Sequence, residues 1–471
     1  MSEEIAVDSM EYDVVIVGGG PSGLSTAIKL KQLAAENNSD LSVCLIEKGS
    51  EIGAHILSGN CFEPTALNEL IPDWKEKGAP LNTPAKKDIV KFFLTEKLSL
   101  GIPFASFFAP NFNNHGNYVM SLANFCRWLA TQAENLGVEI FPGFTAAEVI
   151  YENDMVKGIL TGEMGLTKEG EKKPSYQPPM ELRAKYTIFA EGCRGHLGKK
   201  LISKYALDAN SDPQHYGIGF KEVWDVPKEV HSEGTVMHSF GWPSKSNAGS
   251  YCYHGENNQV YLGIVVPLDY SNPHISPFDE FQQWKHHKDI KKLLENGTRV
   301  AYGARALTKG GYHSRPKMTF PGGILVGCDA GLMVFTKIKG THTAMKSGML
   351  AAESAFEAIS KNRIGEDLID FEEKLKSSWI ETDLYKSRNM TALLHKYGTL
   401  IGGLIMGIEQ FLFRGKLPFT WRHKTPDYAC MKKAAECEKI DYPKPDGVIS
   451  FDKLSSVFLS NTNHEEDQPC H

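Results

Sequence analysis

The stretch Tyr12-Asp13-Val14-Val15-Ile16-Val17-Gly18-Gly19-Gly20-Pro21-Ser22-Gly23 decides the fold of this chain. Its first six residues are mostly β-branched and apolar, which predicts a buried strand, and apolar residues at helical spacing over 24–30 predict a helix after the glycines. Residues 41–46 (LSVCLI) predict a second strand that ends at Glu47. A strand, glycine turn, helix and strand in this order require a parallel sheet with a right-handed crossover.

The glycine turn fits the pattern G-x-G-x-x-G in the context that gives the pattern meaning. Gly18, Gly19, Gly20, Pro21, Ser22 and Gly23 lie directly after a predicted strand and open a predicted helix. The glycines permit a tight turn whose backbone N–H groups can approach a pyrophosphate, and the helix N-terminus favours its negative charge. Glu47 is then placed to bind ribose hydroxyls. The pattern predicts a dinucleotide site, with a glycine-rich surface turn as the alternative.

Two later segments favour FAD over a nicotinamide as the dinucleotide. Residues 186–192 (YTIFAEG) predict a strand that runs into an Ala-x-Gly turn containing Glu191 and Gly192. Residues 324–331 (ILVGCDAG) predict a strand followed by a turn in which Asp329 can bind the ribityl or ribose hydroxyls. A helix that begins near Thr341 to Thr343 would direct its positive end at the flavin pyrimidine ring. An ordinary turn aspartate is the alternative for Asp329.

Length and composition suit a folded protein of two or three structural units. The chain has 471 residues, 41% of them hydrophobic, and a net charge of -6. This charge gives no basic field for nucleic acid, which we do not expect as a partner. The nine cysteines are dispersed without any C-x-x-C, which indicates reduced thiols rather than disulfides, a zinc site or the ligands of a cubane cluster.

A second unit interrupts the first. Residues 217–224, 234–240, 250–254 and 260–266 predict strands of an antiparallel sheet. The predicted fold class is therefore α/β with an α+β insertion: a Rossmann-like FAD-binding domain of the glutathione-reductase type, interrupted by an antiparallel-sheet domain. We expect the first part of the FAD domain over 1–205, the insertion over 206–300, the return of the FAD domain over 301–385 and a helical region over 386–471.

Two segments have the composition of membrane-surface contacts. Residues 98–112 (LSLGIPFASFFAPNF) are dense in aromatics and prolines, and residues 401–413 (IGGLIMGIEQFLF) predict an apolar helix followed by Arg414, Lys416, Arg422, His423 and Lys424. No run of about 18 apolar residues occurs, so a transmembrane helix is not predicted. The alternative is that both segments belong to the core.

The sequence shows no pattern of a catalytic nucleophile with a general base, and no pair of carboxylates that would act as general acid and general base. This suits electron transfer, in which a flavin does the redox chemistry. Arg305, Lys337 and Lys339 are candidates for stabilising reduced flavin, with solvated surface charges as the alternative. His55, His254 and His342 are more simply hydrogen-bonding residues than proton shuttles.

Several longer blocks resemble the electron-transfer flavoprotein:ubiquinone oxidoreductase family. They are 52–55 (IGAH), 113–118 (NNHGNY), 189–193 (FAEGC), 241–243 (GWP), 284–287 (WKHH), 301–306, 337–347 (KIKGTHTAMKS) and 442–447. The resemblance implies FAD, one [4Fe-4S] cluster, electron-transfer flavoprotein as donor, ubiquinone as acceptor and a monotopic place on the membrane. It adds Lys48, Gly53, Ala54, Ala330 and Gly340 to the expected FAD contacts, and it places a quinone at Ala248 and Gly249, where relatives have Gly-Gly.

The resemblance also implies a cluster domain towards the C-terminus. We expect this chain to be truncated before that domain and its cysteine ligands to be missing, because only Cys470 follows Cys437. The expected function is electron transfer from electron-transfer flavoprotein through FAD to membrane ubiquinone, with the flavin-to-quinone step retained. The alternatives are a flavoprotein of the geranylgeranyl-reductase type and a non-catalytic FAD- and membrane-binding module. The acidic N-terminus, unlike a signal or transit peptide, suggests the cytoplasmic face of a bacterial inner membrane, or the mitochondrial inner membrane in a eukaryote.

Overall fold

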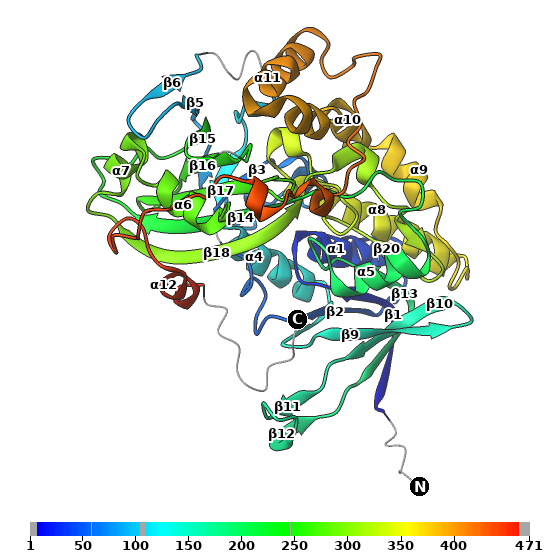
Figure 1. Cartoon of the computed structure of the whole chain (residues 1–471). Coiled ribbons are helices and arrows are strands. Elements are labelled where there is room, and N and C mark those ends of the chain that lie inside the picture. Colours follow the sequence, from blue (N-terminus) through cyan, green and yellow to red (C-terminus); the bar gives the residue numbers. More distant parts are fainter. Residues whose placement is uncertain (1–6, 58, 104–109, 245, 461–471) are drawn as a thin grey trace.

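The computed structural model describes residues 7–57, 59–103, 110–244 and 246–460. Two large sheets carry the fold. In Figure 1 the first sheet lies at the lower right with helices α1 and α8, the second lies at the left, and α11 is at the top above both. This is the predicted arrangement of a Rossmann-like domain with an antiparallel insertion.

The first sheet has the order β19-β20-β13-β1-β2-β8, and β1 pairs in parallel with β13 and β2. Val14, Val15 and Ile16 of β1 are fully buried, as the apolar run predicts. Strands β10 and β9 continue from β13 in antiparallel pairing. The strands are β1 (Ser9–Val17), β2 (Val43–Glu47), β8 (Glu139–Pro142), β9 (Ala146–Glu152), β10 (Met155–Thr161), β13 (Glu181–Phe189), β19 (Thr319–Phe320) and β20 (Gly323–Leu325).

Helices α1 (Pro21–Glu36) and α8 (Thr341–Ser360) pack closely against each other beside this sheet. A Cβ atom on Gly348 would lie only 2.3 Å from the carbonyl oxygen of Ser22, so glycine is required where the helices touch. Helix α4 (Leu122–Asn135) begins after Ser121, whose side chain caps the first turn by accepting from the Asn124 N–H.

The second sheet has the order β18-β14-β17-β16-β15-β5-β6. All four strands predicted for the insertion are present, and their mutual pairings are antiparallel. The sheet also takes in β5 and β6 from before residue 206, and β18 continues past residue 300. The strands are β5 (Lys87–Phe93), β6 (Ser99–Gly101), β14 (Tyr216–Asp225), β15 (Thr235–Gly241), β16 (Gly249–His254), β17 (Gln259–Pro267) and β18 (Thr298–Thr308).

Smaller elements complete the fold. They are the strands β3 (Asn60–Phe62), β4 (Thr83–Pro84), β7 (Tyr118–Met120), β11 (Met164–Leu166) and β12 (Lys172–Gln177), the helices α2 (Thr65–Leu70), α5 (His196–Lys204), α6 (Pro277–Trp284), α7 (Lys288–Leu294), α9 (Asp370–Ser377), α10 (Trp379–Lys386) and α12 (Lys453–Phe458), and the 3-10 turns at 110–112, 311–314, 335–337, 427–430 and 434–436. The helix expected over 401–413 is the second half of α11 (Met390–Leu412), which is kinked at Gly398, where φ is 72°.

Candidate functional site

The glycine turn after β1 is built to bring backbone close to a ligand. Gly18 has a φ of 110°, and a Cβ atom on Gly23 would lie 2.0 Å from the Gly18 carbonyl oxygen. These two positions therefore require glycine, for the turn and for the close packing of helix on strand. Glu47, at the end of β2, accepts from the N–H groups of Gly19 and Gly49, each at 2.8 Å. Each carboxylate oxygen keeps a second lone pair for a hydroxyl donor.

The N-terminus of α1 has space and hydrogen-bonding capacity beside it. Gly20 is the N-cap residue, and no side chain of the described residues caps the helix. A Cβ atom on Gly20 would meet no described atom within 4 Å. The buried hydroxyl of Ser22 has no hydrogen-bond partner in the described part of the chain. An uncapped helix N-terminus facing open space is suited to an anionic group.

Glu191 follows β13 and Asp329 follows β20, two strands that are neighbours in the first sheet. Asp329 accepts from the Gly195 N–H at 3.2 Å through Oδ1, while its buried Oδ2 has no partner among the described residues. Glu191 is used differently, because its two oxygens accept from the N–H groups of Leu197 and Gly198 and cap α5. Burial and the nearby Glu191 raise the pKa of Asp329 well above its ordinary value. Asp329 thus offers a carboxyl oxygen for a further hydrogen bond.

The N-terminus of α8 is the second uncapped helix end of the site. Gly340 is its N-cap residue, and the first turn holds no acidic residue. Thr341 Oγ1 accepts from Asn60 Nδ2 at 2.9 Å, and Thr343 Oγ1 donates to the Gly340 carbonyl at 2.9 Å. Of the other predicted contacts, Gly192 and Gly53 hold positive φ angles of 90° and 85°, Ala330 is fully buried, and Ala54 follows Gly53 on the turn after β2.

The positively charged candidates have other partners. Lys337 Nζ contacts Asp383 at 2.7 Å and Glu63 at 3.1 Å, so its charge is already neutralised. Lys339 is buried and donates to the Lys337 carbonyl, and Arg305 donates to the carbonyl of His55. Burial, together with the charge of Arg305, lowers the pKa of Lys48.

His254 fits the expectation of a hydrogen-bonding histidine, whereas neither ring nitrogen of His342 has a hydrogen-bond partner among the described residues. Burial, followed by the charge of Lys337, lowers the pKa of His342 to about 3, which leaves it a neutral ring stacked on Trp379. His254 is buried and accepts from the Ser232 N–H through Nδ1.

The loop between β15 and β16 meets α11. Asn247, with a φ of 58°, accepts from the N–H and the hydroxyl of Thr399 at 2.9 and 3.0 Å. Ala248 is buried directly after it, and Gly249 begins β16. The sequence reasoning did not single out Asn247, although asparagine is one of the residues that tolerate a left-handed turn position.

Aromatic side chains lie next to one another beside this loop. A Cβ atom on Gly249 would lie 3.3 Å from the ring of Phe240. The ring of Phe112 has its centroid 6.1 Å from that of Phe240 and 5.4 Å from that of His238. Adjacent aromatic rings therefore connect Gly249, through Phe240, to Phe112 at the end of the segment 98–112, of which 104–109 lie outside the described residues.

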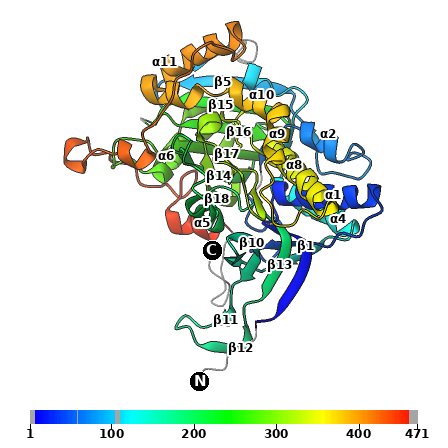
Figure 2. The ribbon, with the colours of Figure 1, turned by 90° about the vertical axis from the view of Figure 1, so that its right-hand side faces the viewer.

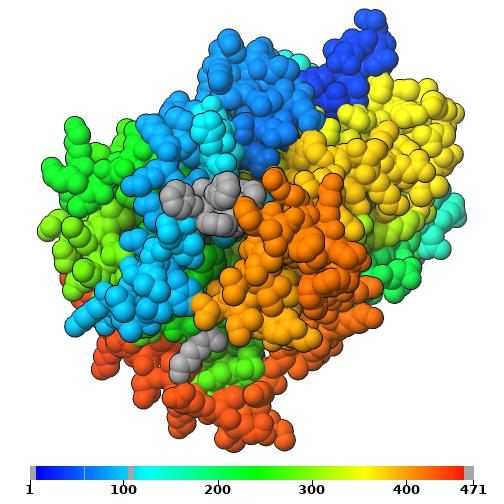
Figure 3. Space-filling view, turned by 90° about the horizontal axis from the view of Figure 1, so that it is seen from above, coloured from blue at the N-terminus to red at the C-terminus, as the bar shows by residue number. Residues whose placement is uncertain are grey.

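One face of the molecule is apolar. Leu400 and Leu404 of α11 are 68% and 66% exposed, and Leu98, Leu100 and Ile102 near β6 are also exposed. Figure 2 shows α11 at the top of the molecule, and in Figure 3 its orange atoms lie beside the light-blue atoms of β5 and β6. Asn111 Nδ2 donates to Gln410 Oε1 at 3.2 Å and joins the two segments.

The cations expected after this helix do not all reach solvent. Arg422 pairs with Asp212 at 2.7 Å but is exposed, as are Arg414, Lys416 and Lys424, whereas His423 is buried. Within the described residues, every helix is too short or too polar to cross a membrane.

Comparison with known proteins identifies the family. The model of the ETF-QO ubiquinone-binding domain matches residues 216–307, which contain most of the second sheet, and a Rossmann-like NAD(P)-binding model matches 16–66. Electron transfer flavoprotein-ubiquinone oxidoreductase of Pseudomonas aeruginosa is 59% identical over 98% of this chain and 85% of its own length. The mitochondrial protein of Bos taurus is 52% identical over 98% of this chain and 76% of its own.

The chain belongs to the electron transfer flavoprotein-ubiquinone oxidoreductase family.

Solved structures of lower identity share the fold. A geranylgeranyl bacteriochlorophyll reductase-like protein from Thermoplasma acidophilum aligns with a TM-score of 0.56 and 20% identity, over 86% of this chain and 98% of that one. The flavin-dependent brominase Bmp2 aligns with a TM-score of 0.57 and 16% identity, over 85% and 90%. These likenesses support the flavoprotein fold of this family member.

The cluster domain of the family is represented at the C-terminus. A model described as the 4Fe-4S domain of electron transfer flavoprotein-ubiquinone oxidoreductase matches residues 447–471, of which the structure describes those up to Ser460. Part of this domain therefore lies in the chain, and the expectation that the chain stops before the cluster domain is wrong. Among the described residues, the groups able to hold a metal contain at most one cysteine each, and Cys470 lies outside them.

Proposed function

We propose that this chain binds FAD across its first sheet and transfers electrons from electron-transfer flavoprotein to ubiquinone. The observation that carries this proposal is 59% identity with an electron transfer flavoprotein-ubiquinone oxidoreductase. The structure adds two helix N-termini, those of α1 and α8, that no side chain of their N-cap residues caps. The residues present fit the cofactor. Gly18 to Gly23 and the α1 N-terminus suit its pyrophosphate, and Glu47 suits the ribose of its adenosine.

The flavin end of FAD fits the second group of residues. Asp329 Oδ2, buried and without a partner in the described chain, can accept from a ribityl hydroxyl. Gly340, Thr341 and Thr343 place backbone N–H groups and the positive end of α8 at the site. When bound, FAD supplies reversible two-electron chemistry, and α8 favours negative charge on its reduced form. Lys48, Gly53, Ala54, Gly192 and Ala330 complete the proposed contacts, whereas Glu191 acts by capping α5 and orienting the turn.

The quinone site of the proposal lies at Ala248 and Gly249. Their backbone groups offer hydrogen bonds to a quinone oxygen, and alanine supplies the same backbone groups as glycine. Phe240 and Phe112 supply apolar contacts for the ring and tail. Since Phe112 lies next to Asn111, which bonds to Gln410 of α11, a quinone would enter from the bilayer at the face formed by α11 and the segment 98–112.

The same face supports a peripheral position on a membrane. The exposed leucines of α11 are followed by the cations Arg414, Lys416 and Lys424, which is the arrangement of an interfacial helix. We propose the cytoplasmic face of a bacterial inner membrane, or the mitochondrial inner membrane in a eukaryote.

Electron entry involves the cluster of the family. Because no group of four cysteines occurs among the described residues, a [4Fe-4S] cluster would need ligands outside them. We propose that the described residues carry the flavin-to-quinone step and that the cluster ligands are not supplied by them.

The test is reduction of a short-chain ubiquinone by the purified protein, with either reduced electron-transfer flavoprotein or dithionite as donor. Ubiquinol formation with the protein donor supports the whole proposal. Ubiquinol formation with dithionite alone supports the flavin-to-quinone step without electron entry. Flavin reduction without any ubiquinol would indicate a non-catalytic binding module, and isoprenoid double-bond reduction in place of ubiquinol would indicate the reductase alternative.

A further inference from the structure

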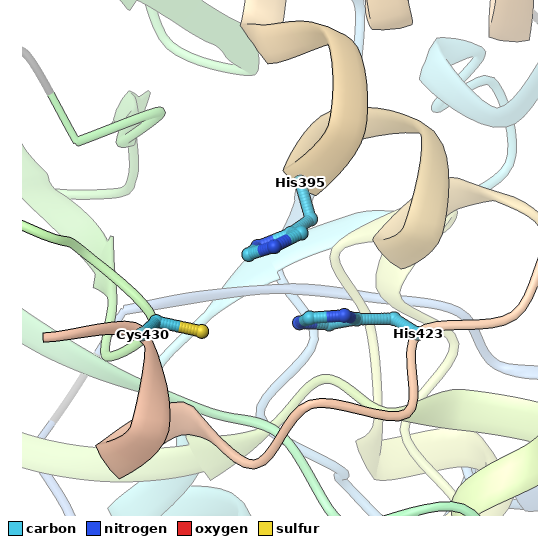
Figure 4. A group of neighbouring side chains, drawn as sticks. All are labelled: His395, His423 and Cys430. Atoms are coloured by element: carbon cyan, nitrogen blue, oxygen red, sulfur yellow. The ribbon is translucent and has the colours of Figure 1, made fainter.

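Three potential metal ligands from distant parts of the chain meet beneath α11. His395 lies in the first half of α11, His423 follows the helix, and Cys430 ends the 3-10 turn at 427–430. One donor atom of each lies within 4.8 Å of those of the other two. Figure 4 shows the Cys430 sulfur pointing towards the two imidazole rings.

His423 carries the observation that points to a ligand. The residue is 9% exposed, and its buried Nε2 has no hydrogen-bond partner in the described part of the chain. The ring is fixed between two others, with centroid distances of 4.2 Å to His215 and 3.7 Å to His395. A buried polar atom without a partner is costly, so its retention favours a ligand at this position.

The carboxylate of Asp269 lies beside both histidines of this group. Asp269 Oδ2 lies 3.1 Å from His395 Nδ1 and 3.9 Å from His423 Nε2. Histidines that bind metals usually donate their other ring N–H to a carboxylate, which fixes the tautomer. With Nδ1 of His395 engaged by Asp269, its Nε2 is the nitrogen available to a metal. Lys309 holds Asp269 in place at 3.2 Å.

We propose that His395, His423 and Cys430 bind a divalent transition metal ion, with Zn²⁺ the best fit. Two imidazoles and one thiolate are ligands that zinc prefers, and a water would complete the tetrahedron, since Asp269 is engaged by His395 and Lys309. Zinc bonds place donor atoms about 3.3 to 3.7 Å apart, so Cys430 and His395, which are both partly exposed, must turn inward. On binding, the Cys430 thiol loses its proton to solvent and forms the sulfur–metal bond.

A second group of acids and histidine does not support such a proposal. Glu63, His342 and Asp383 also converge, but Lys337 Nζ already lies between the two carboxylates at 2.7 and 3.1 Å. A lysine cation there takes the place that a metal ion would need.

The proposed ion would join α11 to the segment that follows the helix. His395 lies just before the kink at Gly398, and the next residue, Thr399, binds Asn247 of the predicted quinone loop. The ion would therefore fix the first half of α11 beside that loop. Because a ligand that binds only the folded state stabilises it, metal binding should raise the melting temperature.

The experiment uses the whole purified chain, dialysed against a chelator and titrated with Zn²⁺, and with Co²⁺ as a spectroscopic probe. The variants are Cys430→Ser and His395→Asn, and the matched control is Cys437→Ser, whose sulfur contacts the Ser271 carbonyl outside the cluster. Zinc and iron are measured separately, so that an iron–sulfur cluster is not counted. Retained FAD content and an unchanged circular dichroism spectrum show that each variant folds.

The proposal predicts one Zn²⁺ per wild-type and Cys437→Ser chain, a thiolate-to-Co²⁺ absorption band and a higher melting temperature with Zn²⁺. Cys430→Ser should lose the band, and both cluster variants should bind Zn²⁺ about 100-fold more weakly or worse. Zinc content and melting temperature that are equal in the wild type and both cluster variants would overturn the proposal. So would a cobalt band that survives Cys430→Ser.

Discussion

The side chain of Asn247 is hydrogen-bonded to both the backbone N–H and the hydroxyl of Thr399, at 2.9 and 3.0 Å. These bonds join the loop that precedes Ala248 to the start of the second half of α11. Through its side chain, Asn247 therefore links the loop of the proposed quinone site to the apolar surface helix α11.

Asn247→Ala removes both bonds, each of which contributes about 1 kcal/mol, and also the longer bond of 3.5 Å that Asn247 Nδ2 donates to the Leu394 carbonyl. The expected result is a fall of several-fold in kcat/KM for ubiquinone with unchanged FAD content, because the loop loses its attachment to α11. The control is Asn257→Ala, which changes another asparagine of positive φ on an exposed turn and should leave ubiquinone reduction intact. Equal effects of the two variants on kcat/KM would show that Asn247 acts only through backbone strain.

Gly20→Ala tests the proposed pyrophosphate position. A Cβ atom there meets no described atom within 4 Å, and Gly20 has an ordinary φ of -84°, so the flavin-free protein should keep its melting temperature. FAD affinity should fall at least about 10-fold, since the added methyl group would occupy space proposed for the phosphates. Gly403→Ala, on the exposed part of α11, is the control. Wild-type FAD affinity in Gly20→Ala would place the pyrophosphate elsewhere.

The raised pKa of Asp329 predicts that the stability of the flavin-free protein depends on pH. Its pKa is raised by burial and by Glu191, so ionising it costs stability as the pH rises above the ordinary carboxyl pKa. Asp329→Asn should therefore raise the melting temperature of the flavin-free protein at about pH 8, with a gain that shrinks towards about pH 5. The exposed carboxylate of Asp73 provides the control Asp73→Asn. A gain independent of pH would contradict the stated cause.

The double variant Leu400→Ser and Leu404→Ser tests membrane binding through α11. Both side chains are about two-thirds exposed, so their replacement should leave the melting temperature nearly unchanged. Burying a leucine in the headgroup region contributes about 1 to 2 kcal/mol, so the partition coefficient onto anionic liposomes should fall about 100-fold. Leu454→Ser on α12, where the leucine is 84% exposed, should not change binding. Unchanged partitioning of the double variant would exclude α11 as the contact.

Local patterns were enough to predict the core of the fold. The apolar run of β1, the glycine turn and the second strand ending at Glu47 appear where the sequence places them, because burial and turn geometry act over few residues. The antiparallel strands of the insertion were likewise visible from their alternation. The family resemblance, rather than spacing, supplied the quinone and the donor.

Features that depend on distant contacts were not predictable. Nothing in Lys87 to Phe93 indicates that β5 pairs in parallel with β15 of the second sheet. Nothing local to Glu191 indicates that its carboxylate caps α5. His395, His423 and Cys430 carry no recognisable metal-binding spacing, since only the folding of α11 over the Asp269 loop brings them together.

The central claim is that FAD held by this chain delivers electrons to a quinone. The most direct measurement mixes the purified, dithionite-reduced protein anaerobically with a short-chain ubiquinone and follows the visible absorbance of the flavin. The proposal predicts rapid return of the oxidised flavin spectrum with one ubiquinol formed per FAD. Flavin that stays reduced with ubiquinone, yet is readily reoxidised by ferricyanide, would contradict it.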